Sequence, residues 1–226
     1  MEMRMRLAVA EDTEVLSRLI DSSVRGLQKE DYSAAQIDNA LKTVFGVDRQ
    51  LIADGTYFVV EARVTSGGKS ASEATAEDVR TRERSTPGRT GAQHAAPLPE
   101  PVEAQKGESA ERFVIAGCGG WSRRKKLYGG DAWTEQRIEY LDPRVDAAKI
   151  RAFFIAPSFA RRGVGTLILE ACEAAAFAEG FRRFEMGATL TGVKLFGARG
   201  YVEVERIDLD IGGGESLPVV RMEKRV

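Results

Sequence analysis

One stretch, residues 150–180, constrains the fold of this chain more than any other. It begins with an apolar run, Ala152 to Ala156, which Pro157 ends because proline cannot donate to a strand ladder. After a glycine-containing turn, apolar residues recur every three or four positions, as on one face of a helix. They are Val164, Leu167, Ile168, Ala171, Cys172 and Ala175. Gly180 follows, where a left-handed C-terminal cap favours glycine. The stretch therefore predicts a buried strand, a turn and a helix.

A strand, a glycine turn and a helix start together form an anion-binding site. The first N–H groups of a helix lack intrahelical partners, and the helix dipole places partial positive charge there. Gly163 and Gly165 carry no side chain that would hold a phosphate away, and Arg161 and Arg162 add positive charge. The turn matches neither the P-loop, which needs Lys after its last glycine, nor the three-glycine dinucleotide fingerprint. A turn that only caps a buried helix is the alternative interpretation.

The residues from Ala160 to Gly165 resemble the acetyl-coenzyme A motif of the GCN5-related N-acetyltransferase (GNAT) superfamily. That motif reads Gln/Arg-x-x-Gly-x-Gly/Ala between a strand and a long helix, and only its first position, Ala160, departs from the pattern. The family also commonly ends its core with a helix of type Asn-x-x-Ala/Val-x-x-Leu-Tyr and a Gly-Phe/Tyr turn. Here Thr191 and Phe196 stand at the Asn and Tyr positions, and Gly200-Tyr201 matches the turn.

The rest of the chain has the element order of that family. Strand patterns occupy 4–10, 56–64, 112–122, 181–189, 201–211 and 217–224, and helical patterns occupy 15–24 and 33–45. Ser33 and Gln36 form a capping box at the start of the second helix, and a change of parity predicts a bulge near Glu205 in a late strand. The resemblance implies an α/β fold: a central mixed sheet with splayed parallel strands four and five, and helices on both faces.

Composition changes sharply between residues 66 and 111. This segment consists mostly of Ser, Gly, Ala, Glu, Arg and Pro, without periodicity, and contains the only histidine, His94. Such a segment cannot bury enough apolar surface to offset the entropy of ordering it. We expect one domain over residues 1–226, with a disordered insertion at 66–111.

The overall composition limits the partners and the compartment. With 33 Lys plus Arg against 34 Asp plus Glu, the chain offers no case for nucleic acid. It has no apolar run long enough to span a bilayer and no signal-peptide core, so we expect no membrane partner. The two cysteines, Cys118 and Cys172, are predicted to be free and buried, which fits a reducing, cytoplasmic location. One His and two separated Cys form no metal cluster.

The resemblance implies that acetyl-CoA, as cosubstrate, lies along the central strand and over the glycine turn. The coenzyme-binding residues would be Phe154, Ile155, Ala156, Arg161, Arg162, Gly163, Val164, Gly165 and Thr166. A backbone N–H near Phe154 or Ile155 would polarise the thioester carbonyl. On the acceptor side, the resemblance makes Asp31, Tyr32 and Trp121 substrate-contact candidates, although solvated loop residues and a core tryptophan beside a bulge are the alternatives.

The acid and the base are less well defined. Many family members protonate the departing thiolate with the tyrosine that Phe196 replaces here, and Phe196 cannot do this. We name Tyr201 as the candidate acid, with Tyr128 and Tyr140 as alternatives, and Glu139 as the candidate base, with Asp146 as its alternative.

These interpretations predict an N-acetyltransferase that moves acetyl from acetyl-CoA to a primary amine of a small molecule or peptide, and they allow a homodimer. A non-catalytic acyl-CoA-binding or sensing protein on the same fold is the alternative that Phe196 raises. A protein-interaction module built around residues 66–111 is a third hypothesis.

Overall fold

The computed structural model describes residues 1–65, 111–125 and 139–226. Its residues fall into two compact units, Met1–Arg63 with Phe113–Val226, and Val64–Arg112. Of the second unit only the strand ends 64–65 and 111–112 are described, so everything below concerns the first. The predicted insertion, apart from residue 111, and the candidate Tyr128 lie outside the described residues.

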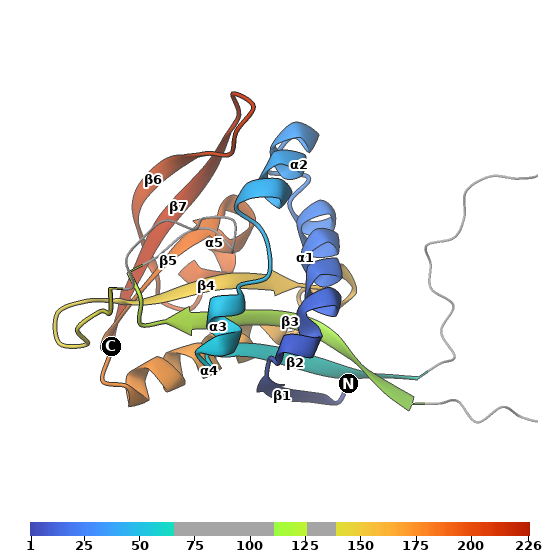
Figure 1. The fold of residues 1–226 in the computed structure, drawn as a ribbon, viewed down its shortest axis with the longest axis horizontal. Helices are drawn as coiled ribbons and strands as arrows, with labels where there is room; N and C mark the ends of the chain where they lie inside the picture. The colour runs from blue at the N-terminus through green and yellow to red at the C-terminus, as the bar shows by residue number, and fades with distance from the viewer. Residues whose placement is uncertain (66–110, 126–138) are drawn as a thin grey trace, which may run out of the picture. The chain divides into compact units, whose positions relative to one another are not determined.

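Seven strands form a single mixed sheet (Figure 1). Their order is β1-β2-β3-β4-β5-β7-β6. The strands are β1 (Met3–Leu7), β2 (Tyr57–Thr65), β3 (Glu111–Ser122), β4 (Ala148–Ile155), β5 (Arg183–Thr189), β6 (Val202–Asp210) and β7 (Ser216–Arg225). The pair β4–β5 is parallel, whereas β1–β2, β3–β4, β5–β7 and β6–β7 are antiparallel. This is the mixed sheet with parallel strands four and five that the resemblance implied.

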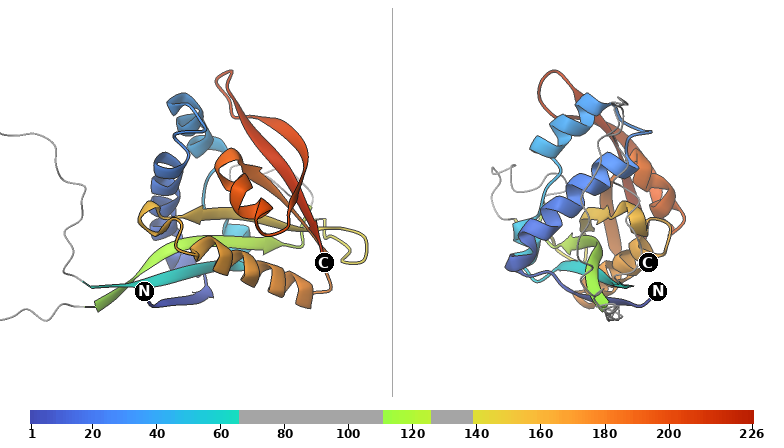
Figure 2. Two further views of the ribbon diagram at one scale, coloured as in Figure 1. Left: turned by 180° about the vertical axis from the view of Figure 1, so that it is seen from behind. Right: turned by 90° about the vertical axis from the view of Figure 1, so that its right-hand side faces the viewer.

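Helices cover both faces of the sheet, with α1, α2 and α3 on one side and α4 and α5 on the other (Figure 2). The α-helices are α1 (Thr13–Leu27), α2 (Ala34–Thr43), α3 (Arg49–Ala53), α4 (Val164–Ala178) and α5 (Leu190–Gly197). Two short 3-10 helices, η1 (Ala10–Asp12) and η2 (Pro157–Phe159), precede α1 and α4. One core cluster joins α1 and α2 to the sheet through residues such as Leu16, Val24, Tyr57 and Phe154.

Local signals in the sequence correctly mark two helix ends. Ser33 Oγ accepts from the Gln36 N–H at 3.1 Å, and the Gln36 side chain accepts from the Ser33 N–H at 2.9 Å, so the capping box of α2 is confirmed. Gly180 has φ 95° just beyond α4, and the next residue, Phe181, donates its N–H to the Ala176 carbonyl. That is the glycine cap predicted for this helix.

The short helix α3 was not predicted from the sequence. Asp48 is its N-cap and accepts from the Leu51 N–H at 3.1 Å. A five-residue helix has too few turns to show a periodic pattern, and its stability comes from packing rather than propensity. Leu51 provides that packing, because it is fully buried in the core cluster.

A bulge interrupts β4 in the middle of the sheet. Cys118 of β3 lies opposite Phe154, but Gly120, two residues on, lies opposite Arg151, three residues back. The extra residue is absorbed at Ala152, which has φ 56° although it is not a glycine. The Phe153 ring then occupies the space above Gly119, where an added Cβ would lie 2.4 Å from it. The glycines of β3 thus admit neighbouring side chains, rather than a ligand.

The late strands behave as their parity predicted. The register of β6 against β7 shifts between Glu203 and Glu205, so the expected bulge is present one or two residues before its predicted place. Gly212, Gly213 and Gly214 all have positive φ in the connection between these strands.

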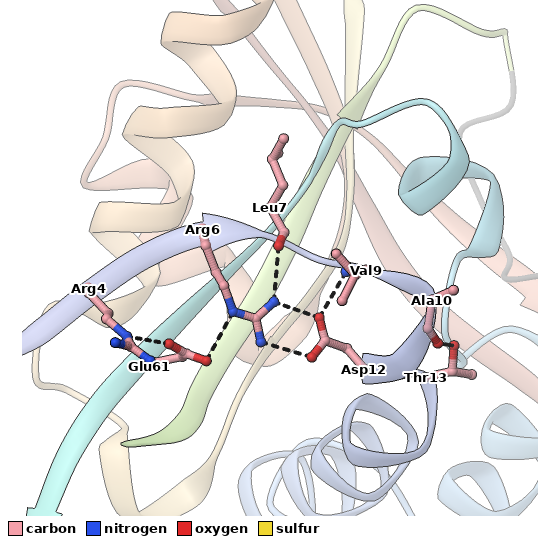
Figure 3. A network of polar contacts seen from close by, with 8 residues as sticks. All are labelled: Arg4, Arg6, Leu7, Val9, Ala10, Asp12, Thr13 and Glu61. Carbon is pink, nitrogen blue, oxygen red and sulfur yellow. Dashed lines mark hydrogen bonds and ion pairs between the residues drawn. The ribbon is translucent and has the colours of Figure 1, made fainter. Parts of the chain in front are cut away.

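A network of arginines and carboxylates ties the first strand to its neighbours (Figure 3). Arg6 donates to both carboxylate oxygens of Asp12, at 2.7 and 2.8 Å, and to Glu61 on β2 at 3.0 Å. Arg4 also donates to Glu61, and Asp12 further accepts from the Val9 N–H at 2.8 Å. We call Arg4, Arg6, Asp12 and Glu61 the β1 clamp, because they hold β1 to β2 and to the start of α1.

Candidate functional site

A large cavity opens where the two parallel strands part. The strands β4 and β5 pair only over 148–150 and 184–186, although β4 continues to Ile155 and β5 to Thr189. The backbone of β4 beyond Ile150 therefore has β3 on one side and no strand on the other. A cavity of about 660 Å³ fills this opening and is lined by residues of both strands. The size suits a ligand much larger than a metal ion or an amino acid.

The cavity has two ends. Residues at the start of α4 and from α5 line one of them, which we call the α4 end: Ala160, Arg161, Gly163, Gly165, Thr166 and Lys194. Residues from α1, from the connection between α2 and α3, and from β6 and β7 line the other, which we call the α1 end: Ser23, Leu27, Gln28, Val44, Phe45, Asp48, Leu209, Leu217 and Val219.

The α4 end is built mainly from backbone. Gly163, the N-cap of α4, has φ 85° and carries no side chain, and no other side chain caps the first turn. The N–H groups that open the helix thus face the cavity without a capping partner. An added Cβ on Gly165 would lie 2.8 Å from the end of the Leu195 side chain, so any larger residue there would displace Leu195 where α4 meets α5.

Positive charge surrounds this helix start. Arg161, at φ 62°, and Lys194 line the cavity, and Arg199 donates to Thr166 Oγ1 at 2.9 Å on the first turn of α4. Lys194 and Arg199 were missed in the sequence analysis because they lie about 30 residues after the glycine turn and reach it only through the packing of α5. Cationic side chains and uncapped N–H groups together suit an anion such as a phosphate.

Hydrogen bonds hold the bulge of β4 at the middle of the cavity. The Ile155 N–H donates to Ser23 Oγ of α1 at 3.2 Å, and Tyr57 donates its hydroxyl hydrogen toward the Ala152 carbonyl at 3.2 Å. Tyr57 Oη also lies 3.2 Å from Cys118 Sγ, and burial raises the pKa of that thiol to about 12. Tyr57 and Cys118 are fully buried, so the bulge rests on groups that solvent cannot reach.

The α1 end is apolar apart from a few polar groups. Its hydrophobic members include Leu27, Val44 and Phe45, and the Phe45 ring meets Phe154 edge to face at 5.8 Å. Gln28 is 6% exposed, and its side-chain oxygen has no hydrogen-bond partner. A buried polar atom of this kind is uncommon in folded proteins and calls for a ligand or water as partner.

A buried ion pair supports the same end. Arg151 of β4 and Asp48 lie 2.5 Å apart, with side-chain exposures of 6% and 2%, and both line the cavity. Burial lowers the pKa of Arg151, an effect that the neighbouring Asp48 opposes. Since an arginine side chain starts from a very high pKa, the pair remains charged and mutually neutralising.

The structure brings together most of the predicted coenzyme-binding residues. Phe154, Ile155, Arg161, Gly163, Gly165 and Thr166 line the cavity. Ala156, Arg162 and Val164 do not: the Ala156 N–H pairs with the Ala116 carbonyl, Val164 is buried in the core, and Arg162 is exposed.

The predicted acceptor contacts lie outside the cavity lining. Tyr32 is buried, donates its hydroxyl hydrogen to the Pro218 carbonyl at 2.7 Å and accepts from the Leu190 N–H at 2.9 Å. Asp31 accepts from the Thr191 hydroxyl. Trp121 is 4% exposed and packs against Phe181. Tyr32 and Asp31 thus tie the loop after α1 to α5 and β7, which border the cavity, and Trp121 belongs to the core.

The candidate acid and base also lie outside the cavity lining. Tyr201 is 3% exposed, its ring lies 6.1 Å from that of Phe196, and burial followed by the nearby Glu173 raises its pKa far above the usual value. Such a hydroxyl holds its proton firmly. Glu139 is half exposed and forms an ion pair with Lys125 at the surface. Tyr140 contacts Arg124 through its ring and is exposed. Phe196 itself does line the cavity.

Among the helices of residues 1–65, 111–125 and 139–226, none is long and apolar enough to cross a membrane. The same residues contain no cluster of three or more His, Cys, Asp or Glu side chains that could hold a metal ion.

Comparison with known proteins agrees with this geometry. The model of the acetyltransferase (GNAT) family matches residues 95–201. No curated protein matches the chain in sequence. Among solved structures, a GCN5-related N-acetyltransferase from Rhodopseudomonas palustris, also described as a class-II aminotransferase, is 19% identical, with 100% of this chain and 99% of that chain covered and a TM-score of 0.56. The PaiA N-acetyltransferase from Thermoplasma acidophilum, in complex with coenzyme A, is 11% identical over 100% of both chains, with a TM-score of 0.51.

The fold, the parted parallel strands and the family match define an acyltransferase. Residues 95–201 carry the sequence match to the acetyltransferase (GNAT) family, and the fold is that of solved GCN5-related N-acetyltransferases, as the residues around Gly163 and Gly200 indicated.

Proposed function

We propose that this protein binds acetyl-CoA in the cavity between β4 and β5 and transfers the acetyl group to a primary amine. The observation that carries this proposal is the continuity of the cavity. It runs from the uncapped, positively charged start of α4, through the opening between the parallel strands, to an apolar pocket under α1. A long ligand with an anionic head and a reactive tail fits this arrangement.

The residues present fit the coenzyme at both of its characteristic parts. The N–H groups at the start of α4, with Arg161 and Lys194, would hold the diphosphate. The free edge of β4 beyond Ile150 would pair with the amide groups of the pantetheine arm as an added strand does. The thioester would then lie near the bulge at Ala152 and Phe153, where the cavity passes through the sheet.

Direct transfer needs little side-chain chemistry from this chain. The amine nitrogen forms a bond to the thioester carbonyl carbon, the carbon–sulfur bond breaks, and coenzyme A leaves as the thiolate. Phe196 gives no proton to that thiolate, but a thiolate is a tolerable leaving group near neutral pH. Among the described lining residues the only carboxylate is Asp48, which Arg151 and the Leu51 N–H occupy. The amine proton therefore goes to solvent, and the enzyme acts chiefly by placement.

Isothermal titration with acetyl-CoA tests the proposal, using Gly165→Leu and Gly197→Leu as a matched pair. A side chain at Gly165 meets Leu195 and covers the helix start, whereas an added Cβ at Gly197 has open space around it. We choose Gly165 rather than Gly163 because the positive φ of Gly163 would strain any replacement. We expect Gly165→Leu to abolish binding and Gly197→Leu to preserve it. Equal affinities of the two variants would overturn the proposed site.

A non-catalytic acyl-CoA sensor is the second candidate, because Phe196 and the occupied Asp48 leave the cavity without a free acid or base among its described residues. Release of coenzyme A thiol in the presence of amines separates the two candidates. Binding of acetyl-CoA without thiol release over a broad amine panel would favour the sensor.

We also propose a cytoplasmic location, which the buried free thiols Cys118 and Cys172 support. The homodimer and the single-domain organisation remain predictions, to be checked by light scattering and by limited proteolysis.

A further inference from the structure

Gln28 is held in place by the backbone around it, yet its side chain has an unused group. It caps the C-terminus of α1, where its N–H donates to the Val24 carbonyl at 3.1 Å. Its own carbonyl accepts from the N–H groups of Asp31 and Tyr32, both at 3.0 Å. The residue is 6% exposed, lines the cavity, and its Oε1 has no partner. If the amide were turned, its nitrogen would occupy the same unpartnered position, so a ligand group is needed either way.

The walls around this amide are apolar. The lining residues of this end from α1, the connection between α2 and α3, β6 and β7 are Leu27, Val44, Phe45, Leu209, Leu217 and Val219. The edge-to-face contact of Phe45 with Phe154 adds an aromatic surface to them. Side chains of this kind stabilise the apolar or aromatic part of a bound ligand, and they form no hydrogen bonds with a polar chain that would lose its water on binding.

The charges of the cavity disfavour a cationic acceptor. Of the described lining residues, Arg151, Arg161 and Lys194 are basic, and the single acidic one, Asp48, is paired with Arg151. A polyamine needs carboxylates for each ammonium group that does not react, and an unpaired ammonium in an apolar pocket is strongly disfavoured. The same environment favours the neutral form of the reacting amine, which is the nucleophilic form.

We propose that the α1 end selects a primary amine on an apolar, aromatic body, of the arylalkylamine class, and that Gln28 Oε1 accepts a hydrogen bond from its neutral amino group. This inference rests on the proposed acetyl transfer. The amine uses one N–H to hold Gln28 and its lone pair to attack the thioester carbon. The new nitrogen–carbon bond replaces the carbon–sulfur bond, coenzyme A leaves as thiolate, and the extra amine proton passes to water.

The test measures kcat/KM with acetyl-CoA for phenethylamine, tryptamine and spermidine, by release of coenzyme A thiol. For the unaltered enzyme we expect at least tenfold higher kcat/KM with the aromatic amines than with spermidine. A preference for spermidine would overturn the inference while leaving the proposed transfer intact. Failure of acetyl-CoA to bind, in contrast, would overturn the proposed function itself.

Three variants assign the preference to the amide. Gln28→Leu removes the hydrogen bond at similar volume and should raise KM for phenethylamine about tenfold, with the Kd for acetyl-CoA unchanged. Gln28→Glu should shift the kcat/KM ratio at least tenfold toward spermidine, because it adds the missing carboxylate. Gln50→Leu is the matched control on exposed α3, outside the cavity lining, and should change neither value. An unchanged KM in Gln28→Leu would contradict the role of Gln28.

Discussion

The two ends of the cavity solve the problem of recognition in different ways. The α4 end consists of helix N–H groups, two glycines and cationic side chains, and all of its lining residues except Lys194 come from one short stretch of chain. The α1 end is assembled from α1, the segment before α3, and the late strands β6 and β7, and its polar groups are a buried amide and a buried ion pair. The difference teaches that the end proposed to bind the coenzyme is mostly local in the chain, whereas the end proposed to select the acceptor is assembled from distant segments.

The largest predicted effect is a loss of stability on disrupting the buried ion pair at the α1 end. Asp48→Asn removes the carboxylate that lies 2.5 Å from the buried Arg151 guanidinium, and it weakens the cap of α3. We expect the free energy of unfolding to fall by about 3–5 kcal/mol, the usual effect of removing one partner of a buried pair. Urea denaturation followed by circular dichroism measures it, with Asp38→Asn on exposed α2 as control. A loss under about 1 kcal/mol would mean that solvent reaches this pair more freely than its burial indicates.

A substitution in the β1 clamp should change the stability of the protein without changing ligand binding at either end of the cavity. The Arg6 guanidinium, by its hydrogen bonds, holds the pKa of Asp12 below its usual value. A carboxyl with a depressed folded-state pKa contributes stability above its unfolded pKa of about 4. That contribution is lost as the pH falls through the folded value. Asp12→Asn should therefore lower stability at pH 7 by about 1.5–3 kcal/mol and flatten the loss of stability below pH 4.

Thermal unfolding between pH 2 and 7 tests this, with acetyl-CoA affinity at pH 7 as the second readout. The affinity should stay unchanged, since the clamp lies outside the cavity lining. A matching loss of affinity would show that β1 and the cavity are coupled.

Removal of one hydroxyl, that of Tyr57, should affect the middle of the cavity. Tyr57→Phe removes the hydrogen bond to the Ala152 carbonyl and keeps the buried ring. We expect a loss of about 1 kcal/mol in stability. We also expect kcat to fall about three- to tenfold with unchanged Kd for acetyl-CoA, because the bulge would be less well fixed. Tyr201→Phe serves as the matched comparison. It should leave kcat nearly unchanged, and a larger fall than in Tyr57→Phe would restore Tyr201 as the acid.

The smallest predicted effect is a change in acetyl-CoA affinity on removing one cation from the α4 end. Lys194→Ala should weaken acetyl-CoA binding about three- to tenfold at low salt, less at high salt, because Lys194 lines the cavity as one of several cations. Arg162→Ala is the control, since Arg162 is exposed and outside the lining. Equal losses in both titrations would indicate a diffuse electrostatic field instead of a defined site.

The same division explains what the sequence could reveal. The strand, the glycine turn and the cap at Gly180 depend on neighbours in the chain, so local patterns predicted them. The box at Ser33 is local in the same sense. Six of the nine expected coenzyme contacts line the cavity, because they belong to this local pattern. The other three, Ala156, Arg162 and Val164, are next to lining residues in the chain but do not line the cavity themselves.

The residues that the sequence could not assign depend on contacts between distant segments. Gln28 is an ordinary helix-end residue in the sequence, and only the folded chain shows it as a buried, unpartnered amide in the same cavity lining as Leu209 and Leu217. Lys194 lines the cavity from α5, which is distant in the chain from the glycine turn. Asp48 lines it as the N-cap of α3, a helix that the sequence did not predict. Trp121, Tyr32 and Asp31 were candidates for substrate contact in the sequence. In the structure Trp121 packs against Phe181, and Tyr32 and Asp31 form hydrogen bonds with the start of α5.

The bulge at Ala152 has a consequence for how such a protein can change over time. The backbone of β4 on either side of it has no strand partner at the opening between β4 and β5, and backbone groups are ones that every residue possesses. Replacement of most neighbouring side chains would leave those groups in position, so the proposed reaction centre would tolerate substitution while the walls under α1 could diverge. On the proposed function, this scaffold would therefore permit a change of acceptor at little risk to the chemistry.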